Sequence, residues 1–320
     1  MRHRIRSSTA FADDVRCSLL RTPRQLPSRY LYDPLGSALF DAICELPWYG
    51  ITRAETRLLA DHRGEIFARL PALTRIVELG PGDGRKLRTL VEGTSASLTV
   101  HLIDVSAGAL GRAAHALSGA AHVTVVTHEA SFEDGLDGIA PLLRNDSPPL
   151  VLFLGSNIGN FDPPVSLALL RRVRAALGRG GTLLIGADLV KPERDLLLAY
   201  DDPLGVSGAF NLNLLLRINR ELGGHFDLRA FRHRAVWNAA ASRMEMYAVS
   251  TKAQCVRIDA IDLDVELAAG DAIWTESSYK YTADGLTRHL DDAGFEPVVQ
   301  WIDGDAAFAL TLAQAIRVSV

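Results

Sequence analysis

Between residues 73 and 189, short apolar runs alternate with segments whose apolar residues recur at helical spacing. The segment 165–177 has this spacing and ends at Gly178, a residue type that commonly terminates helices. The apolar runs predict buried strands at residues 76–79, 98–103, 122–127, 150–154 and 182–185. Strands that alternate with helices predict a parallel sheet with helices on both faces, so we expect a doubly wound α/β domain.

The pattern changes after Lys191-Pro192. Residues 193–220 have helical spacing, and β-type segments such as 243–249 follow without intervening helices. The end of the chain again predicts a helix, at 283–293, and then two strands, at 298–301 and 308–312. We expect these last strands to complete the parallel sheet as an antiparallel pair, and the middle of the chain to form an insertion of mixed α+β structure.

A glycine-rich loop, Glu78-Leu79-Gly80-Pro81-Gly82-Asp83-Gly84, follows the first predicted strand. Glycines allow a tight turn and a close approach of the backbone to a ligand. Asp104 ends the next strand, about 20 residues further on, where a carboxylate accepts hydrogen bonds from ribose hydroxyls. A glycine turn of purely structural function would account for the loop alone, but Asp104 favours a cofactor that carries a ribose.

The acid before the first glycine narrows the type of cofactor. Glu78 suits a cationic or amine-bearing ligand better than a pyrophosphate, which binds backbone N–H groups without a neighbouring anion. A nicotinamide-dependent dehydrogenase is therefore the weaker interpretation. The loop with its preceding acid resembles the first motif of the class I S-adenosylmethionine-dependent methyltransferases.

Composition limits the partners of the chain. Its 320 residues, 48% hydrophobic and 22% charged, are typical of an ordinary globular protein with a sizeable core. The net charge of −4 provides no field that would attract nucleic acid or an anionic membrane, so we expect neither partner. No apolar run approaches the roughly 18 residues of a membrane span.

Cysteine and histidine spacing argues against a disulfide framework and against a metal site. Cys17, Cys44 and Cys255 are far apart and form no CxxC pair, which indicates a reducing, cytoplasmic location. The histidines, which include His101, His128 and His233, have no metal-ligand spacing, so we expect no bound metal. We expect the chain to act as a monomer.

Several segments together resemble the histidine-specific S-adenosylmethionine-dependent methyltransferases, in order from about residue 26 to residue 312. These segments are residues 30–41, 46–49, 153–160, 188–191, 199–202 and 275–278. That family makes hercynine, the Nα-trimethylated histidine used in ergothioneine biosynthesis. The resemblance implies a Rossmann-like class I methyltransferase domain, at 54–190 plus 281–320, and a mixed α+β substrate-binding domain, at 1–53 plus 191–280.

The resemblance also implies the site residues. Asn160 and Tyr200 would hold the carboxylate and amine of L-histidine, and Tyr32 matches a position that lines the family's pocket. We expect Asn160 and Tyr32 to be the catalytic residues, because the amine proton needs an acceptor, which is either a tyrosine hydroxyl, with Tyr32 as the candidate, or a bound water. The expected substrate-binding residues are Tyr49, Asn160, Tyr200, Met246, Glu276 and Ser278, with Glu276 and Ser278 at the imidazole. The expected S-adenosylmethionine-binding residues are Glu78, Gly80, Gly82, Lys86, Asp104, Ser131 and Phe132.

Each of these residues has a simpler interpretation when it is taken alone. Asn160 would cap a loop, Glu276 would be an exposed carboxylate on a strand, and Lys86 would be solvated. The tyrosines and Met246 would be core residues. The occurrence of all of them in family order favours the functional interpretation.

Departures from the family pattern leave the methyl acceptor open. Gly50-Ile51 follow Tyr49 where the family commonly has a bulkier pair, Ser131-Phe132 replace Asp-Phe near the adenine, and Pro81 stiffens the glycine loop. The alternatives are a methyltransferase for another amino acid or a histidine derivative, and a non-catalytic protein that binds the cofactor and an amino acid.

Overall fold

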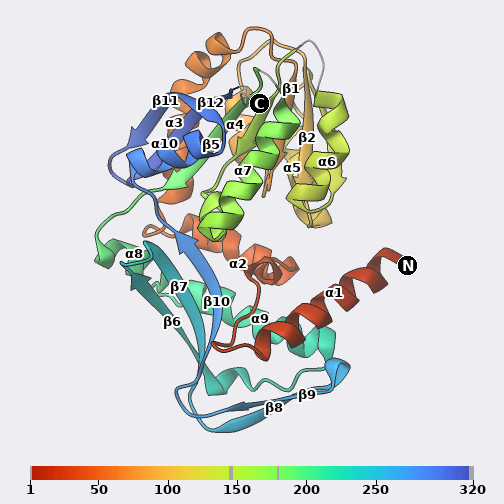
Figure 1. The fold of residues 1–320 in the computed structure, drawn as a ribbon, viewed down its shortest axis with the longest axis vertical. Helices are drawn as coiled ribbons and strands as arrows, with labels where there is room; N and C mark the ends of the chain where they lie inside the picture. Colours follow the sequence, from red (N-terminus) through yellow and green to blue (C-terminus); the bar gives the residue numbers. More distant parts are fainter. Residues whose placement is uncertain (1, 144–146, 179, 317–320) are drawn as a thin grey trace. The chain divides into compact units, whose positions relative to one another are not determined.

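The computed structural model describes residues 2–143, 147–178 and 180–316, which form two compact units (Figure 1). The sheet unit comprises Ile51–Val190 and Tyr279–Val320, and the inserted unit comprises Met1–Gly50 and Lys191–Ser278. The corresponding boundaries expected from the sequence are residues 54 and 281. The assignment of a separate function to each unit stays a prediction.

A seven-stranded sheet in the order β11-β12-β5-β4-β1-β2-β3 runs through the described part of the sheet unit. Its strands are β1 (Arg75–Leu79), β2 (Leu98–Asp104), β3 (Val123–Glu129), β4 (Leu150–Phe153), β5 (Thr182–Asp188), β11 (Phe295–Asp303) and β12 (Phe308–Ala315). Strands β1 to β5 pair in parallel, whereas β12 is antiparallel to both β5 and β11. The predicted Rossmann-like α/β class and the antiparallel closing pair are confirmed.

Burial along the strands follows their position in the sheet. Every residue of β4 and β5 is buried, because both strands lie inside the sheet and have helices above and below. The edge strand β3 has partly exposed and exposed residues instead. The continuous apolar runs at 150–154 and 182–185 therefore correctly predicted buried strands, and both lie inside the sheet.

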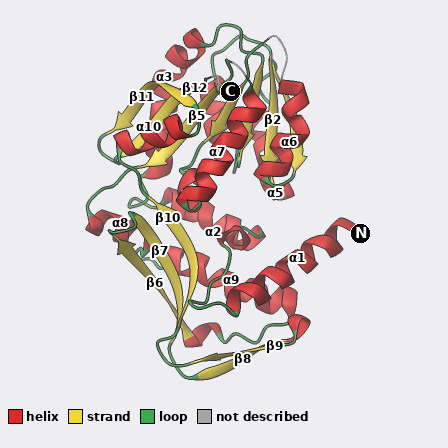
Figure 2. Ribbon diagram, in the orientation of Figure 1, coloured by secondary structure: helices red, strands yellow, loops and turns green. Residues whose placement is uncertain are grey.

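Helices cover both faces of this sheet (Figure 2). On one face α3, α4 and α5 pack in succession, and on the other face α7 packs between α6 and α10. These helices are α3 (Ile51–Arg69), α4 (Arg85–Val91), α5 (Ala107–Leu117), α6 (Phe132–Leu143), α7 (Pro163–Leu177) and α10 (Ala283–Asp292), and the 3-10 turn η2 spans Asn157–Asn160. The predicted helices at 165–177 and 283–293 are confirmed.

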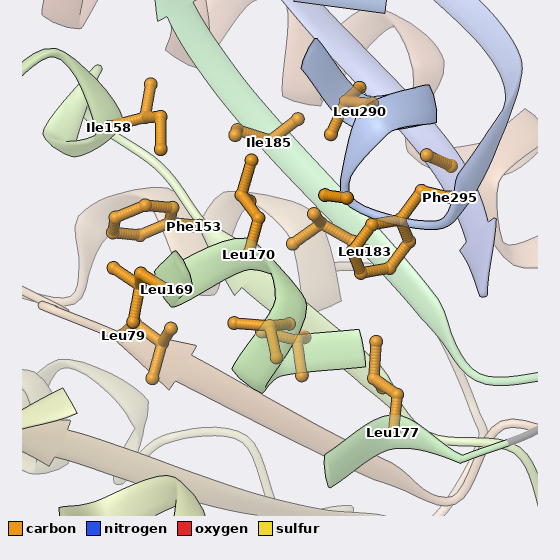
Figure 3. Packing of buried hydrophobic residues seen from close by; sticks show 14 of the residues in the cluster. Leu79, Phe153, Ile158, Leu169, Leu170, Leu177, Leu183, Ile185, Leu290 and Phe295 are labelled. Carbon is orange, nitrogen blue, oxygen red and sulfur yellow. The ribbon is translucent and has the colours of Figure 1, made fainter. Parts of the chain in front are cut away.

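The face covered by α6, α7 and α10 has a continuous apolar core (Figure 3). Leu170 of α7 and Leu290 of α10 are fully buried with Leu183 of β5 and Phe295 of β11. Helix α7 is positioned by its ends, with Pro163 in the first turn and Gly178 at its C-terminus in a conformation with φ +66°. This core fixes the loops that follow the strands at their carboxyl ends.

The inserted unit combines helices with two small sheets, in the orders β10-β7-β6 and β8-β9. Helix α9 packs against α2, β6 and β7. The helices are α1 (Arg2–Leu19), η1 (Ser28–Leu31), α2 (Pro34–Glu45), α8 (Glu193–Tyr200), α9 (Val206–Leu222), η3 (Leu228–Ala230) and η4 (Asp259–Ile261). The strands are β6 (Phe231–Asn238), β7 (Arg243–Ser250), β8 (Gln254–Ile258), β9 (Leu263–Leu267) and β10 (Ala272–Tyr279).

The segment predicted to be helical, 193–220, forms two helices, α8 and α9, and the break at 201–205 between them was not predicted. Asp202 accepts hydrogen bonds from the N–H groups of Leu204, Val206 and Ser207. These bonds stabilise the first turn of α9, which begins at Val206. Gly205 precedes α9 with φ +74°, and Pro203 lies in the same break. The local turn chemistry overrides the helical periodicity here.

Substitution of Leu183 by Ala tests the core beneath the strand ends. Leu183 has no exposed surface, so we expect the free energy of unfolding to fall by about 2 to 5 kcal/mol. Leu142→Ala is the control, since the Leu142 side chain is 51% exposed and should lose less than about 0.5 kcal/mol. Urea unfolding followed by circular dichroism would measure both values, and equal losses would contradict this placement of the core.

Candidate functional site

The glycine-rich loop connects β1 to α4 through three left-handed residues. Gly80, Gly82 and Gly84 have φ values of +73°, +59° and +78°, which residues with a Cβ rarely adopt. Gly84 directly precedes α4, and a Cβ there would lie 2.7 Å from the Cα of Ala113. The loop therefore requires glycine for its backbone conformation and for its packing on α5.

The glycine at position 80 faces side chains from two other loops. A Cβ at Gly80 would lie 2.9 Å from Nδ2 of Asn157 and 3.3 Å from Cζ of Phe132. Asn157 follows β4 and Phe132 begins α6, so the ends of β1, β3 and β4 meet here. Asn157 was not among the expected site residues. It lies in the same 3-10 turn as the predicted Asn160.

Asp104 and Ser131 lie at neighbouring strand ends. Asp104 ends β2, and its Oδ1 accepts a hydrogen bond from the N–H of Ser106 at 2.8 Å, while burial raises the pKa of its carboxyl. Ser131 caps α6, since its Oγ accepts a hydrogen bond from the N–H of Asp134 at 3.1 Å. A cofactor contact by either residue stays a prediction.

Lys86 does not have the solvated position that an isolated lysine would favour. Its Nζ lies 2.5 Å from Oε2 of Glu55, a carboxylate of α3 that is fully buried. The two oxygens of Glu55 also accept hydrogen bonds from the N–H of Gly155, at 2.9 and 2.8 Å. Lys86 is thus held at the carboxyl ends of the strands by a partner that the sequence analysis missed.

Two glycines make room for this ion pair. A Cβ at Gly186 of β5 would lie 1.8 Å from Oε1 of Glu55, and a Cβ at Gly155 would lie 3.3 Å from Nζ of Lys86. Glu55 itself occupies a buried position of α3 between Ala54 and Leu58. An acid on the apolar face of a predicted helix was the available signal for it.

Glu78 is a buried carboxylate whose hydrogen-bonding capacity is incompletely used. It is 2% exposed, and its Oε2 has no hydrogen-bond partner among the described residues. Burial raises its pKa to about 8, and the carboxylates of Glu55, Asp83 and Asp104 add to this effect while Lys86 opposes it. Such an oxygen would be satisfied by a ligand that carries an ammonium group.

The inserted unit brings three of the predicted substrate residues, Tyr49, Tyr200 and Ser278, into one cluster with Tyr32. The ring centroids of Tyr32 and Phe40 are 5.5 Å apart, those of Phe40 and Tyr49 are 6.1 Å apart, and those of Tyr49 and Tyr200 are 6.5 Å apart. The Tyr200 hydroxyl donates a hydrogen bond to Oγ of Ser278 at 2.8 Å. Residues from three distant stretches of the chain therefore form one continuous series of contacts.

Glu276 and Met246 lie on the strands of the same unit. Glu276 of β10 is 8% exposed, which excludes the simple interpretation of an exposed strand carboxylate. Met246 of β7 is buried, and its carbonyl accepts a hydrogen bond from Thr275 Oγ1 at 2.9 Å. Hydrogen bonding between β7 and β10 thus fixes the backbone on which both residues stand.

Asn160 belongs to the sheet unit, in a loop that is anchored on both sides. The Oγ of Ser156 accepts a hydrogen bond from the N–H of Asp188 at 2.9 Å, and the Tyr279 hydroxyl donates to Oδ1 of Asp162 at 2.8 Å. A Cβ at Gly159 would lie 2.7 Å from the carbonyl oxygen of Tyr279. These contacts give the loop that carries Asn160 a defined conformation.

The model of the family described as histidine-specific, S-adenosylmethionine-dependent methyltransferase matches residues 11–315. The chain belongs to this family. It is 40% identical over 312 residues to the histidine N-alpha-methyltransferase of Mycolicibacterium smegmatis, covering 96% of this chain and 95% of that protein. The histidine N-alpha-methyltransferase of Mycobacterium tuberculosis is 38% identical over 308 residues, with 95% of this chain and 94% of that protein covered.

A third relative is the ergothioneine biosynthesis protein 1 of Neurospora crassa, 28% identical over 290 residues. The match covers 88% of this chain and 32% of that protein. The predicted family is thereby confirmed, and the chain is an S-adenosylmethionine-dependent methyltransferase rather than a nicotinamide-dependent dehydrogenase.

The residues at the strand ends fit the methyltransferase cofactor. Among the described residues Oε2 of Glu78 has no partner, which suits the cofactor's α-ammonium, and the side chains of Asn157 and Phe132 leave no room for a Cβ at Gly80.

None of the helices that the structure describes has the length and apolar character of a membrane span.

Glu78 gives a testable pH dependence of stability without cofactor. Its pKa of about 8 in the folded state lies above the ordinary value of 4.5, so the folded state binds the proton more tightly. Stability is therefore lost between about pH 5 and pH 8, on the order of a few kcal/mol, as the unfolded state releases the proton first. Glu78→Gln should lack this loss.

The measurement is urea unfolding of both proteins at pH 5 and pH 8. The difference between the two proteins isolates Glu78, because the other titrating groups are common to both. If the free energies of unfolding of the two proteins had parallel pH profiles, Glu78 would not be protonated in the folded state.

Proposed function

We propose that this methyltransferase transfers methyl groups to the α-amine of L-histidine and so produces hercynine. Its family membership and its similarity to two mycobacterial histidine N-alpha-methyltransferases support this activity. The observation that carries the proposal is the series of contacts from Tyr32 to Ser278, which joins Tyr32 to three of the expected substrate residues of the inserted unit.

In this proposal the sheet unit binds S-adenosylmethionine. When bound, the cofactor would supply an electrophilic methyl group on a sulfonium, and the neutral thioether would be the leaving group. Glu78 binds the α-ammonium, Lys86 binds the carboxylate, and Asp104 accepts hydrogen bonds from the ribose. Gly82, where a Cβ would meet no atom within 4 Å, leaves space for the ligand, Gly80 lies beside it in the loop, and Phe132 and Ser131 contact the adenine.

The residues of the inserted unit bind the amino acid in this proposal, and the resemblance assigns Asn160 of the sheet unit to the same ligand. The amide of Asn160 offers both a donor and an acceptor, so one side chain orients the carboxylate and the amine. Tyr49 and Tyr200 line the amino-acid end, and Met246 supplies an apolar wall. Glu276 accepts a hydrogen bond from an imidazole N–H, and Ser278 provides a second polar contact.

Catalysis in such a site consists mainly of positioning. Correct orientation of two bound reactants supplies roughly 7 to 11 kcal/mol of barrier lowering, so the orienting residues are the main catalytic ones. The attacking amine has to be neutral, and a nearby sulfonium disfavours its protonated form. The Tyr32 hydroxyl is the proposed acceptor of the amine proton.

We also propose that the protein acts as a monomer in the cytoplasm. Cys17, Cys44 and Cys255 form no disulfide within the described residues, which suits a reducing compartment. Size-exclusion chromatography with light scattering would contradict the monomer if it gave a mass near twice 34.7 kDa.

The activity is tested by incubating the protein with S-adenosylmethionine and a panel of amino acids. We expect mass spectrometry to show Nα-methylated histidine and little methylation of other amino acids. Methylation of a different amino acid at a higher kcat/KM would support the alternative acceptor. Histidine binding without methylation would support a non-catalytic role.

Substitution of Glu276 by Gln tests the imidazole contact. The loss of a charged hydrogen-bond acceptor should lower kcat/KM for histidine about 10- to 100-fold. The control is Glu266→Gln, which changes an exposed carboxylate on β9 of the same unit and should have no effect. An equal loss of activity with histidine and with an apolar amino acid would contradict an imidazole-specific role of Glu276.

A further inference from the structure

The charges around the Glu55–Lys86 pair do not balance. Glu55, Lys86 and Glu78, here named the charge cluster, are coupled electrostatically, since both Lys86 and Glu55 act on the carboxyl of Glu78. The cluster has two carboxylates and one ammonium group. When Glu78 is ionised it therefore has one surplus negative charge, and that charge is buried.

The other acids near Glu78 each have an arginine in their surroundings. Asp83 forms an ion pair with Arg85, and Arg112 acts on the carboxyl of Asp104. Glu55 and Glu78, by contrast, share Lys86. When Glu78 is ionised, the surplus negative charge consequently resides in the charge cluster.

The cofactor and its product differ in charge at one atom. S-adenosylmethionine and S-adenosylhomocysteine share an α-ammonium, an α-carboxylate and a nucleoside. Methyl transfer converts the sulfonium of the first into the neutral thioether of the second. A site with a surplus negative charge distinguishes these two ligands even if every other contact is the same.

We propose that Glu55 is a specificity-determining residue, whose buried charge shifts the binding preference of the site from S-adenosylhomocysteine toward S-adenosylmethionine. It thereby favours exchange of the spent product for a new methyl donor. The proposal rests on the cofactor site described above and is independent of which amino acid accepts the methyl group.

The surroundings of Glu55 suit this role because they prevent its charge from moving away. Both of its oxygens accept hydrogen bonds from the N–H of Gly155, and Oε2 also contacts Lys86. Because Gly186 has no Cβ, Oε1 of Glu55 can occupy the space next to it. A charge fixed in a low-dielectric position acts on a nearby ligand without first reorganising, and salt screens it weakly.

The test is isothermal titration calorimetry of wild-type protein and Glu55→Gln with three ligands and no amino acid, at pH 9, where Glu78 with its pKa of about 8 is ionised. These are S-adenosylmethionine, S-adenosylhomocysteine and sinefungin, which has an ammonium-bearing carbon in place of the sulfonium. We expect the Kd of both cationic ligands to rise about tenfold more than the Kd of S-adenosylhomocysteine. Sinefungin separates the effect of charge from a contact with the methyl group.

Two further variants complete the experiment. Asp61→Asn removes one charge from the exposed surface of the same helix and should leave the ratio of the Kd values unchanged. Glu78→Gln removes the other carboxylate, keeps the Glu55–Lys86 pair and should change the ratio in the same direction as Glu55→Gln. If Glu55→Gln does not fold, which thermal unfolding would reveal, Glu78→Gln still tests whether the charge of the cluster separates the cationic ligands from S-adenosylhomocysteine, and an unchanged ratio would overturn the proposal.

An equal change in the Kd of all three ligands would overturn the proposal, since it would show that Glu55 only shapes the loop. A change in Asp61→Asn as large as that in Glu55→Gln would also overturn it. If the wild-type protein bound none of the three ligands, the cofactor site itself would be wrong. The outcome of the amino-acid panel affects neither result.

Discussion

The ion pair between Glu55 and Lys86 is the interaction on which the cofactor end of the sheet depends. It joins α3 to α4, and the hydrogen bonds from Gly155 attach the loop after β4 to the same carboxylate. Loss of one partner of a buried pair costs about 3 to 5 kcal/mol, because the other charge is left in an apolar environment. The pair fits into the interior because positions 155 and 186 are glycines, whose missing Cβ atoms leave space for its polar atoms.

The residues expected to bind the substrate have a different kind of support. Tyr32, Tyr49, Tyr200 and Ser278 are linked by aromatic and hydroxyl contacts, and no ion pair joins these four to one another among the interactions found in the described residues. In such a cluster the aromatic rings pack against one another, and their packing fixes the positions of the hydroxyl groups. The expected cofactor residues thus stand beside fixed buried charge, and these expected substrate residues stand in an aromatic cluster.

Local patterns were sufficient to predict the sheet and its closing antiparallel pair, because buried strands and the glycine loop leave strong signals over a few residues. The break between α8 and α9 was missed, since Asp202 acts through hydrogen bonds that helical periodicity does not register. Glu55 was missed for a related reason. Its partner Lys86 and its donor Gly155 are 31 and 100 residues away, so only the folded chain reveals the group.

The order of the strands has a consequence for synthesis of the chain on the ribosome. Strand β5 ends at Asp188, but its neighbour β12 begins only at Phe308. One edge of β5 therefore remains unpaired while the whole inserted segment 191–278 is translated. An apolar edge strand exposed for that time is a site for wrong pairing or aggregation. Early folding of the inserted segment would not remove this hazard, because only the last strands of the protein cover that edge.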